Sequence, residues 1–228
     1  MIPFDSYCEP FYEKLGLDYR STYAFGQIFW THTYYPHENL EFWRPQFDPA
    51  DKTRTTAKTF VIETAPTDPF RRSLPLAKPD LGIREEFLVI RAKRRPVVLL
   101  QPESYVLRGL NKGPGRIKLN RHLCTVALAF GLSNAKGDTR CDLGLLERIR
   151  ILEFPQLMFL PKNPGVSDMD GLLKLDELQS VFTNNLEASQ YRLADEAVEV
   201  LRWQLRLLLT GSTSSEYDEL REFLKDTI

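Results

Sequence analysis

The sequence predicts a mainly β fold with helices appended at its C-terminal end. Up to residue 182, short runs of apolar, β-branched and aromatic residues alternate with turn-forming clusters of glycine, proline and asparagine, as in strand-rich domains. From residue 187 onward, apolar residues instead recur at spacings of three and four, which is typical of an amphipathic helix. We therefore expect a small β barrel or strongly bent sheet, followed by helices.

The same change of pattern predicts how the chain is organised. We expect an N-terminal extension over residues 1–24, a barrel domain over 25–182 and a helical appendage over 183–228. Residues 34–83 contain prolines at positions 36, 45, 49, 66, 69, 75 and 79, and this density excludes an uninterrupted helix. We interpret residues 34–83 as a long insertion within the barrel domain.

The expected strands are short and rich in β-branched or aromatic residues. They lie at 25–33, 58–64, 85–92, 96–100, 124–132, 148–154 and 156–161, with a last short strand inside 172–182 that passes into a helical turn. Periodicity alone leaves residues 124–132 (CTVALAFGL) ambiguous between strand and helix. Their length and composition favour a strand.

Two helices are expected at the C-terminal end. Apolar residues between Tyr191 and Leu208 predict a helix over 187–209. The stretch GSTSS at 211–215 then interrupts the chain, and Ser215 with Asp218 forms a capping box for a final short helix. That last helix is a candidate for covering a neighbouring subunit.

Composition narrows the class of protein. The net charge of −1 excludes a basic field over the whole surface, although it allows a local basic patch for nucleic acid. Three cysteines without a CxxC pair predict neither a disulfide scaffold nor a zinc site and favour a reducing, cytoplasmic location. No window approaches the roughly 20 apolar residues of a membrane-spanning helix. We expect no cofactor and no membrane association.

Paired arginines at the entrance of an apolar strand are the first candidate site. In RRPVVLL, Arg94 and Arg95 precede Pro96, and proline is tolerated at the first residue of a strand. Guanidinium groups at such a rim can form forked contacts with phosphate. Charges flanking an apolar strand also simply guard against aggregation. Both interpretations remain open at this point.

Other basic and imidazole groups are weaker candidates. In GLNKGPGR, Lys112 and Arg116 could line a groove, although the stretch lacks the ending of a phosphate loop and solvated charge is the favoured explanation. His122 is a candidate for acid–base chemistry because imidazole titrates near neutrality. Arg44, between Trp43 and Pro45, is a candidate second rim contact. The spacing of the histidines gives no expectation of a metal site.

The order of several motifs resembles the MazF/PemK/Kid-like toxin family. FGQIFW resembles the opening strand of that family, with Gln27 in place of the usual acid, and RRPVVLL resembles its arginine–proline–valine strand. CTVALAFGLS is similar to the next strand, while RIRILEF, QLMFLP and GLLKLDELQSV are similar to the closing strands. The similarity covers little more than half of the chain, 25–33 and 94–182.

The resemblance implies an SH3-like barrel and a metal-independent endoribonuclease that cleaves single-stranded RNA as the toxin of a toxin–antitoxin pair. It implies a small antitoxin protein as partner and a homodimer. Arg95 matches the strand-leading arginine of the family, which makes it the candidate phosphate stabiliser or acid. The catalytic threonine of the family aligns with Leu132 without a gap and with Ser133 with a gap, so Ser133 is the candidate hydroxyl.

The substrate-binding candidates around this pair are Arg94, Lys112, Arg116, His122 and Arg44. The long insertion, the chain length and the charge depart from the pattern of the family. The alternative is therefore a catalytically inactive barrel that acts as a protein- or nucleic-acid-binding module.

Overall fold

The computed structural model describes residues 2–34, 50, 92–101, 123–133 and 141–226, together with the backbone of strands at 41–47, 55–61 and 87–89. The chain divides into two compact units. Unit 1 combines Met1–Thr33 with Arg94–Ile228, and unit 2 is Tyr34–Lys93. The residues of the predicted insertion thus fall in unit 2.

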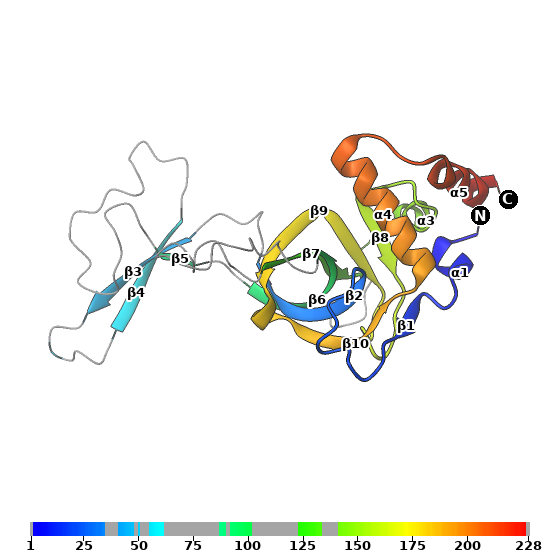
Figure 1. The fold of residues 1–228 in the computed structure, drawn as a ribbon. Helices are drawn as coiled ribbons and strands as arrows, with labels where there is room; N and C mark the ends of the chain where they lie inside the picture. The colour runs from blue at the N-terminus through cyan, green and yellow to red at the C-terminus, as the bar shows by residue number, and fades with distance from the viewer. Residues whose placement is uncertain are drawn as a thin grey trace. The chain divides into compact units, whose positions relative to one another are not determined.

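Unit 1 is built on a seven-stranded sheet, so the predicted mainly β class is confirmed (Figure 1). The strand order is β1-β10-β2-β6-β7-β9-β8. The strands are β1 (Tyr12–Lys14), β2 (Gln27–Tyr34), β6 (Ala92–Gln101), β7 (Leu123–Gly131), β8 (Leu157–Leu160), β9 (Gly171–Phe182) and β10 (Glu187–Leu193).

The sheet is open and strongly bent. The pairs β1–β10, β10–β2, β6–β7, β7–β9 and β9–β8 are antiparallel. The long strand β9 curves in Figure 1, and its register against β7 shifts where Leu128 pairs with Lys174 but Ala127 pairs with Leu178. Among the described strands, no ladder joins β1 to β8 and closes a barrel. These edges approach nonetheless, because the Tyr12 hydroxyl donates to the Pro161 carbonyl at 3.0 Å.

Strand alternation gives the sheet two apolar faces. One face, here the α4 face, carries Ile28, Val98, Ala127 and Leu173 in the largest buried cluster. The other, here the Phe130 face, carries a second cluster and the ring of Phe130, which packs against it. The buried strand residues of this second cluster are Phe29, Val97, Leu99, Cys124, Val126, Leu128 and Val181.

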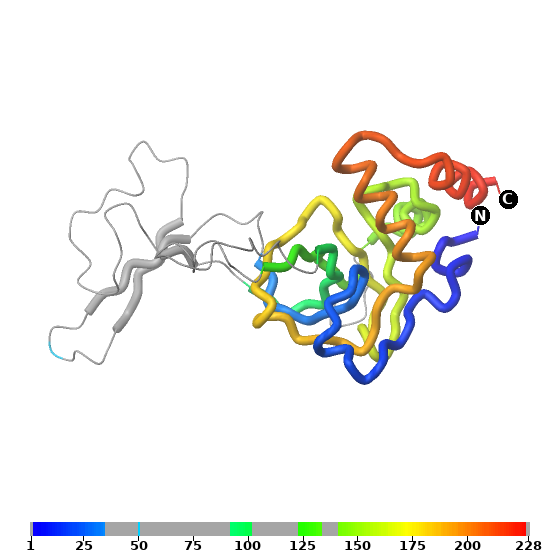
Figure 2. Tube along the Cα trace, viewed as in Figure 1, coloured from blue at the N-terminus to red at the C-terminus, as the bar shows by residue number. Residues whose placement is uncertain are grey.

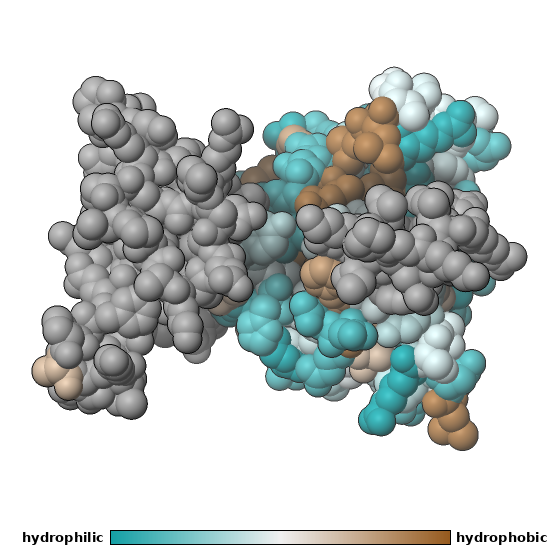
Figure 3. Space-filling view, turned by 60° about the vertical axis from the view of Figure 1, so that its left-hand side comes forward, coloured by the Kyte–Doolittle hydropathy of each residue, from teal (hydrophilic) through white to brown (hydrophobic). Residues whose placement is uncertain are grey.

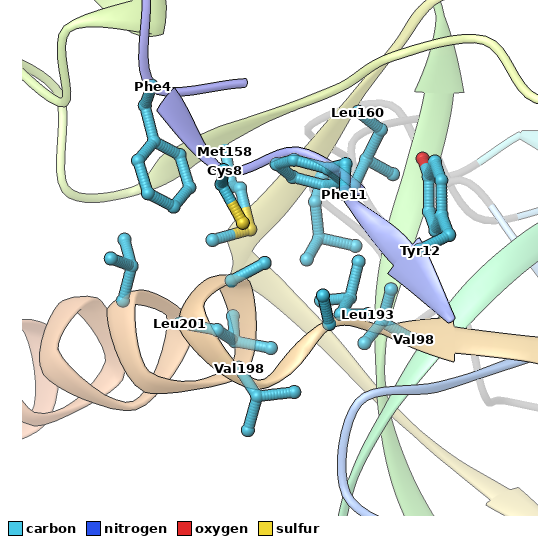
Figure 4. Packing of buried hydrophobic residues seen from close by; sticks show 14 of the residues in the cluster. Phe4, Cys8, Phe11, Tyr12, Val98, Met158, Leu160, Leu193, Val198 and Leu201 are labelled. Carbon is cyan, nitrogen blue, oxygen red and sulfur yellow. The ribbon is translucent and has the colours of Figure 1, made fainter. Parts of the chain in front are cut away.

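Helices cover the α4 face. Helix α4 (Asp195–Thr210) buries Val198 and Leu201 in the same cluster as the sheet residues. Phe4 of helix α1 (Phe4–Tyr7) and Phe11, just before β1, belong to the same cluster and lie on the side of α4 that Figure 4 shows. Helix α5 (Ser215–Asp226) completes this layer with its own buried residues.

The two ends of the chain come together in this layer. The rings of Tyr7 and Phe223 are in edge contact, with centroids 5.9 Å apart. The marked ends of the trace accordingly lie on the same side of unit 1 (Figure 2). Helix α4 ends at Gly211, whose φ of 70° is left-handed and whose N–H donates to the Leu207 carbonyl. Glycine adopts this conformation at little cost.

Three predictions in unit 1 were wrong in detail. Residues 148–154 are not a strand, since helix α3 (Leu143–Arg150) occupies their first part; Asp142 caps it by accepting from the Leu145 N–H at 3.0 Å. The expected helix over 187–209 begins only at Asp195, because residues 187–193 pair with β2 and β1 as β10. The cap of α5 is Ser214, whose hydroxyl oxygen accepts from the Tyr217 N–H at 3.3 Å.

The last strand and its turn are close to the prediction, with a difference in length. Strand β9 extends over all of Gly171–Phe182, and the helical turn is the 3-10 helix η1 (Thr183–Asn185) that follows it. The outer surface of unit 1 carries both hydrophilic and apolar residues. Figure 3 shows hydrophilic residues around separate apolar patches on the face that it views.

Unit 2 contains a three-stranded antiparallel sheet in the order β4-β3-β5. Its strands are β3 (Glu41–Phe47), β4 (Thr55–Val61) and β5 (Phe87–Val89). The sequence predicted strands overlapping β4 and β5 but none at β3. At Pro45 the strand β3 pairs with β4 alone, because β5 pairs only with residues 41–43, and proline is tolerated where a strand forms the edge of a sheet.

Candidate functional site

Arg94 and Arg95 are consecutive residues of β6, and their side chains contact different aromatic rings. The Arg95 guanidinium carbon lies 4.6 Å from the centroid of the Phe130 ring. The Arg94 guanidinium carbon lies 4.6 Å from the centroid of the Trp30 ring. Successive side chains of a strand point to opposite faces. The candidate site therefore has two parts, one on each face of the sheet.

The first part is the Phe130 cluster, which consists of Arg95, Phe130, Lys174 and Glu177. Val97 pairs with Leu128, so Arg95 stands opposite Phe130 two residues further along the two strands. The Lys174 ammonium nitrogen lies 5.4 Å from the centroid of the same ring. Two cations thus contact one aromatic ring, an arrangement that cation–π attraction stabilises.

The irregular register of β9 positions the remaining member of the Phe130 cluster. Between Lys174 and Leu178, the strand accommodates residues 175–177 that have no partner on β7. An insertion of this kind re-aims side chains. It brings the Glu177 carboxylate back to the Lys174 ammonium, with which it forms an ion pair.

The Lys174–Glu177 ion pair is largely withdrawn from water. The exposed fractions of the two side chains are 29% and 17%. Within the described residues, the Oε2 atom of Glu177 is buried and has no hydrogen-bond partner. A buried carboxylate oxygen without a donor costs free energy, and functional sites often carry such groups. The Phe130 cluster therefore combines two cations with a carboxylate that retains an unused acceptor.

The second part is the Arg94 cluster, which consists of Trp30, Arg94 and Glu187. The Arg94 Nη2 donates to Glu187 Oε2 at 2.5 Å, and the two side chains are 47% and 67% exposed. Trp30 and Glu187 are paired residues of β2 and β10. Exposed pairs of this kind contribute little to stability. The Arg94 cluster is thus an open surface feature, in contrast to the Phe130 cluster.

Ser133 lies on the α4 face and not beside Arg95. Its hydroxyl donates to the Met169 sulfur at 3.7 Å. Met169 covers Gly131, where an added Cβ would meet the Met169 sulfur at 2.5 Å. Gly131 follows Ala129 in the alternation, and Ala129 belongs to the α4-face cluster. The described contacts therefore do not bring Arg95 and Ser133 together, and a catalytic role for Ser133 stays a prediction.

The other predicted site residues lie beyond what can be placed. Lys112, Arg116 and His122 fall outside the described residues. Arg44 belongs to β3 of unit 2, where the described part of the structure is limited to the backbone. Their proposed roles in substrate binding therefore stay predictions.

Sequence reasoning missed Lys174 and Glu177. A signal for them exists in LLKLDEL, where Lys174 stands between leucines and two acids follow. A charged residue at such a position needs a partner. The partner could not be identified from spacing, because the register shift that brings Glu177 to Lys174 depends on pairing with β7.

Neither a metal centre nor a membrane span is found in the described residues. No group of three or more His, Cys, Asp and Glu side chains among them is arranged to hold a metal ion. No helix within the described ranges is both long enough and apolar enough to cross a membrane. A scan of the chain against protein-family models finds no matching family, and a search of curated proteins finds no match either.

Proposed function

We propose that this chain is a divergent MazF/PemK/Kid-like protein that binds single-stranded RNA at the Phe130 cluster and cleaves it without a metal. The observation that carries the proposal is the convergence of Arg95 and Lys174 on the Phe130 ring, at 4.6 and 5.4 Å. Cations that neutralise phosphates, combined with an aromatic side chain, are the usual means of binding a single strand.

The SH3-like barrel is part of the same proposal. Its support is the second apolar cluster, in which strands β2, β6, β7 and β9 contribute buried residues to one common core. Further support is the approach of the sheet edges through the hydrogen bond from Tyr12 to Pro161. A sheet that wraps around its own core is what a barrel of this type requires.

The chemistry follows from what metal-independent RNA cleavage needs. The ribose 2′-oxygen attacks the adjacent phosphorus and a base accepts the 2′-hydroxyl proton. The bond to the 5′-oxygen breaks as that oxygen takes a proton from Arg95, the candidate acid, which water then reprotonates. Arg95 and Lys174 would stabilise the charge on the phosphorane oxygens. Glu177 would accept the 2′-hydroxyl proton once RNA binding exposes its Oε2 atom, which is buried in the free protein. The expected products are a 2′,3′-cyclic phosphate and a 5′-hydroxyl.

The resemblance extends the proposal to partners. We propose a small antitoxin protein that occludes the RNA-binding surface, and a homodimer as the active species. Expression without the antitoxin would then slow growth, and Arg95→Ala would relieve this effect. A genome position beside a gene for a small, partly disordered protein would be consistent with the pair.

The test is cleavage of a mixed single-stranded RNA pool in the presence of a metal chelator. Arg95→Ala should lower the cleavage rate by about 100-fold or more, the scale of losing one charge-stabilising group, without a large change in melting temperature. Arg148→Ala is the matched control, because Arg148 lies over the Phe154 ring at 4.8 Å, away from the Phe130 cluster. Wild-type protein that leaves the pool intact would contradict the nuclease.

One observation favours a second candidate, a barrel that binds RNA without cutting it. Ser133 contacts Met169 on the α4 face, so the hydroxyl that the resemblance assigns lies on the other side of the sheet from Arg95. Fluorescence anisotropy with a labelled RNA strand separates the two candidates. Saturable binding that weakens in Arg95→Ala, without any product, would identify the binding module.

A further inference from the structure

A groove lies between α1, α4 and α5, on the side of unit 1 where both chain ends meet (Figure 1). Its volume is about 490 Å³, and its floor is aromatic and aliphatic. Phe4 and Tyr7 line it from α1. A groove of this size can hold a ligand or the side chains of a partner.

Helix α4 lines the groove with a simple pattern. Glu196, Glu199, Val200 and Trp203 all face it. These residues are spaced i, i+3, i+4 and i+7, so they form one stripe along the helix. The stripe begins with two carboxylates and ends with an aliphatic and an aromatic side chain.

Helix α5 lines the groove with the same pattern. Its lining residues are Glu216, Glu219, Leu220 and Phe223, at identical spacings and in the same order of chemical character. Two helices of independent sequence thus present the motif Glu-x-x-Glu-aliphatic-x-x-aromatic to one groove. The apolar members also contact the core, because Val200 is buried in it and Trp203 and Leu220 are partly buried against it. The buried residues of α5, Tyr217 and Leu224, lie on another stripe, so core packing does not require the glutamates or Phe223.

The two stripes run in opposite directions. The Trp203 ring, at the end of the α4 stripe, lies 6.0 Å from the Tyr217 ring near the start of α5. At the other end, Phe223 contacts Tyr7 at 5.9 Å. Tyr7 precedes Cys8, which belongs to the same buried cluster as Ala197 near the start of α4. At each end of the groove, the glutamates at the start of one helix therefore lie near the aromatic side chain at the end of the other helix.

The groove is acidic. None of its lining residues is Lys, Arg or His. Glu199 pairs with Arg202 at 3.0 Å, and Glu216 accepts from the Ser215 hydroxyl at 3.3 Å. Glu196 and Glu219 have neither an ion pair nor a hydrogen bond within the described residues. These two carboxylates thus lie beside exposed aromatic rings, and no cation among the described residues pairs with them.

We propose that this groove binds a basic amphipathic helix of a partner protein. Seven residues of α4 extend over about 10 Å, so a helix lying along the groove would carry Lys or Arg at positions i and i+7. Apolar residues at i+3 and i+4 would contact the floor, which is the usual helix-in-groove mode. Charge complementarity selects a basic partner over an acidic one. This surface is separate from the RNA chemistry proposed above and does not depend on it.

The test uses a labelled helical 15-residue peptide with lysine at positions 4 and 11 and leucine at positions 7 and 8. Anisotropy with the full chain should show saturable binding that weakens as salt rises. A peptide with glutamate in place of both lysines should bind at least about tenfold more weakly, since like charges then face each other. Spermidine, added as competitor, shows whether a small cation alone occupies the site.

Matched double variants locate the binding. Glu196→Gln with Glu219→Gln should weaken the lysine peptide by about three- to tenfold, the range expected for two exposed charge contacts. Glu147→Gln with Glu222→Gln removes the same charge outside the groove and should leave affinity unchanged. Phe223→Ala should weaken binding, whereas Leu209→Ala, at a residue that is 76% exposed outside the groove, should not.

Three results would overturn the proposal. They are equal affinity for the two double variants, equal affinity for the lysine and glutamate peptides, and binding of spermidine without binding of the peptide. Melting temperatures of all variants, which change exposed or half-buried side chains, verify that each is folded.

Discussion

Arg94 and Arg95 are neighbours in sequence, yet they occupy opposite kinds of environment. Arg94 forms an exposed ion pair with Glu187 above Trp30. Arg95 lies half-buried against Phe130, the ring that Lys174 also contacts, and Lys174 is ion-paired with a mostly buried Glu177. The difference teaches that strand alternation turns a dipeptide of identical residues into two sites of different chemistry. It also assigns the two arginines different expected sensitivities to mutation.

The first way to sharpen this comparison is to test the core behind each face. Leu201→Ala on the α4 face should lower the free energy of unfolding by about 2–5 kcal/mol, because Leu201 is fully buried and leaves a cavity. Leu99→Ala should have a similar effect on the Phe130 face. Urea unfolding measures both. The exposed Leu209→Ala should change the value by less than about 0.5 kcal/mol, and equal losses at all three would contradict the two-core description.

The second test measures how alkaline pH lowers the stability of the α4 face, where Tyr217 is buried. Burial raises the pKa of the Tyr217 hydroxyl to about 12, from the ordinary value of 10.0. Above pH 10 the unfolded chain releases this proton while the folded chain keeps it, so stability falls as pH rises from 10 to 12. The loss is on the order of 2–3 kcal/mol.

Tyr217→Phe should remove that part of the alkaline loss, as followed by melting temperature at pH 8 to 12. Tyr7→Phe, at an exposed tyrosine, is the control and should leave the profile unchanged. Burial also raises the pKa of the Cys8 thiol to about 11, so some alkaline loss should persist in both variants. Identical profiles for Tyr217→Phe and wild type would show that Tyr217 titrates as an exposed group.

The third test separates the two ion pairs. Glu177→Gln should lower stability by about 1–2 kcal/mol, because it leaves the partly buried Lys174 without its carboxylate, a loss smaller than that of a fully buried pair. In the proposed function it should also abolish RNA cleavage. Chemical denaturation together with the cleavage assay distinguishes a structural role from a catalytic one. Unchanged cleavage would remove Glu177 from the chemistry.

The smallest effect is expected on the Arg94 side. Glu187→Gln should change the free energy of unfolding by about 0–1 kcal/mol, and less at high salt, because the pair that it breaks is exposed. Thermal unfolding at low and high salt measures this difference. A loss as large as that of Glu177→Gln would end the contrast between the two faces.

Local patterns predicted most of the strands but not how they pair. β-branched and aromatic runs identified β2, β6, β7 and β8, since composition and length there point to one structure. Residues 148–150 and 187–193 were misassigned, because short mixed segments take the structure that tertiary pairing imposes.

The candidate site was predictable only in part. Arg95 was identified from its position before Pro96 and an apolar strand. Lys174 and Glu177 come from a distant strand, and only the irregular pairing of β9 with β7 brings them beside Phe130. That three-residue irregularity has no local sequence signature, so the composition of the Phe130 cluster required the three-dimensional structure.

The order of the sheet has a consequence for how this chain can vary. Strands β2 and β6 are hydrogen-bonded neighbours, although nearly all of unit 2 lies between them in the sequence. The connection therefore leaves and re-enters unit 1 at adjacent points, as a tight reverse turn would. Long inserts at such points cost little because closure entropy grows slowly with length. The segment between β2 and β6 can thus change in length while the seven strands keep their neighbours.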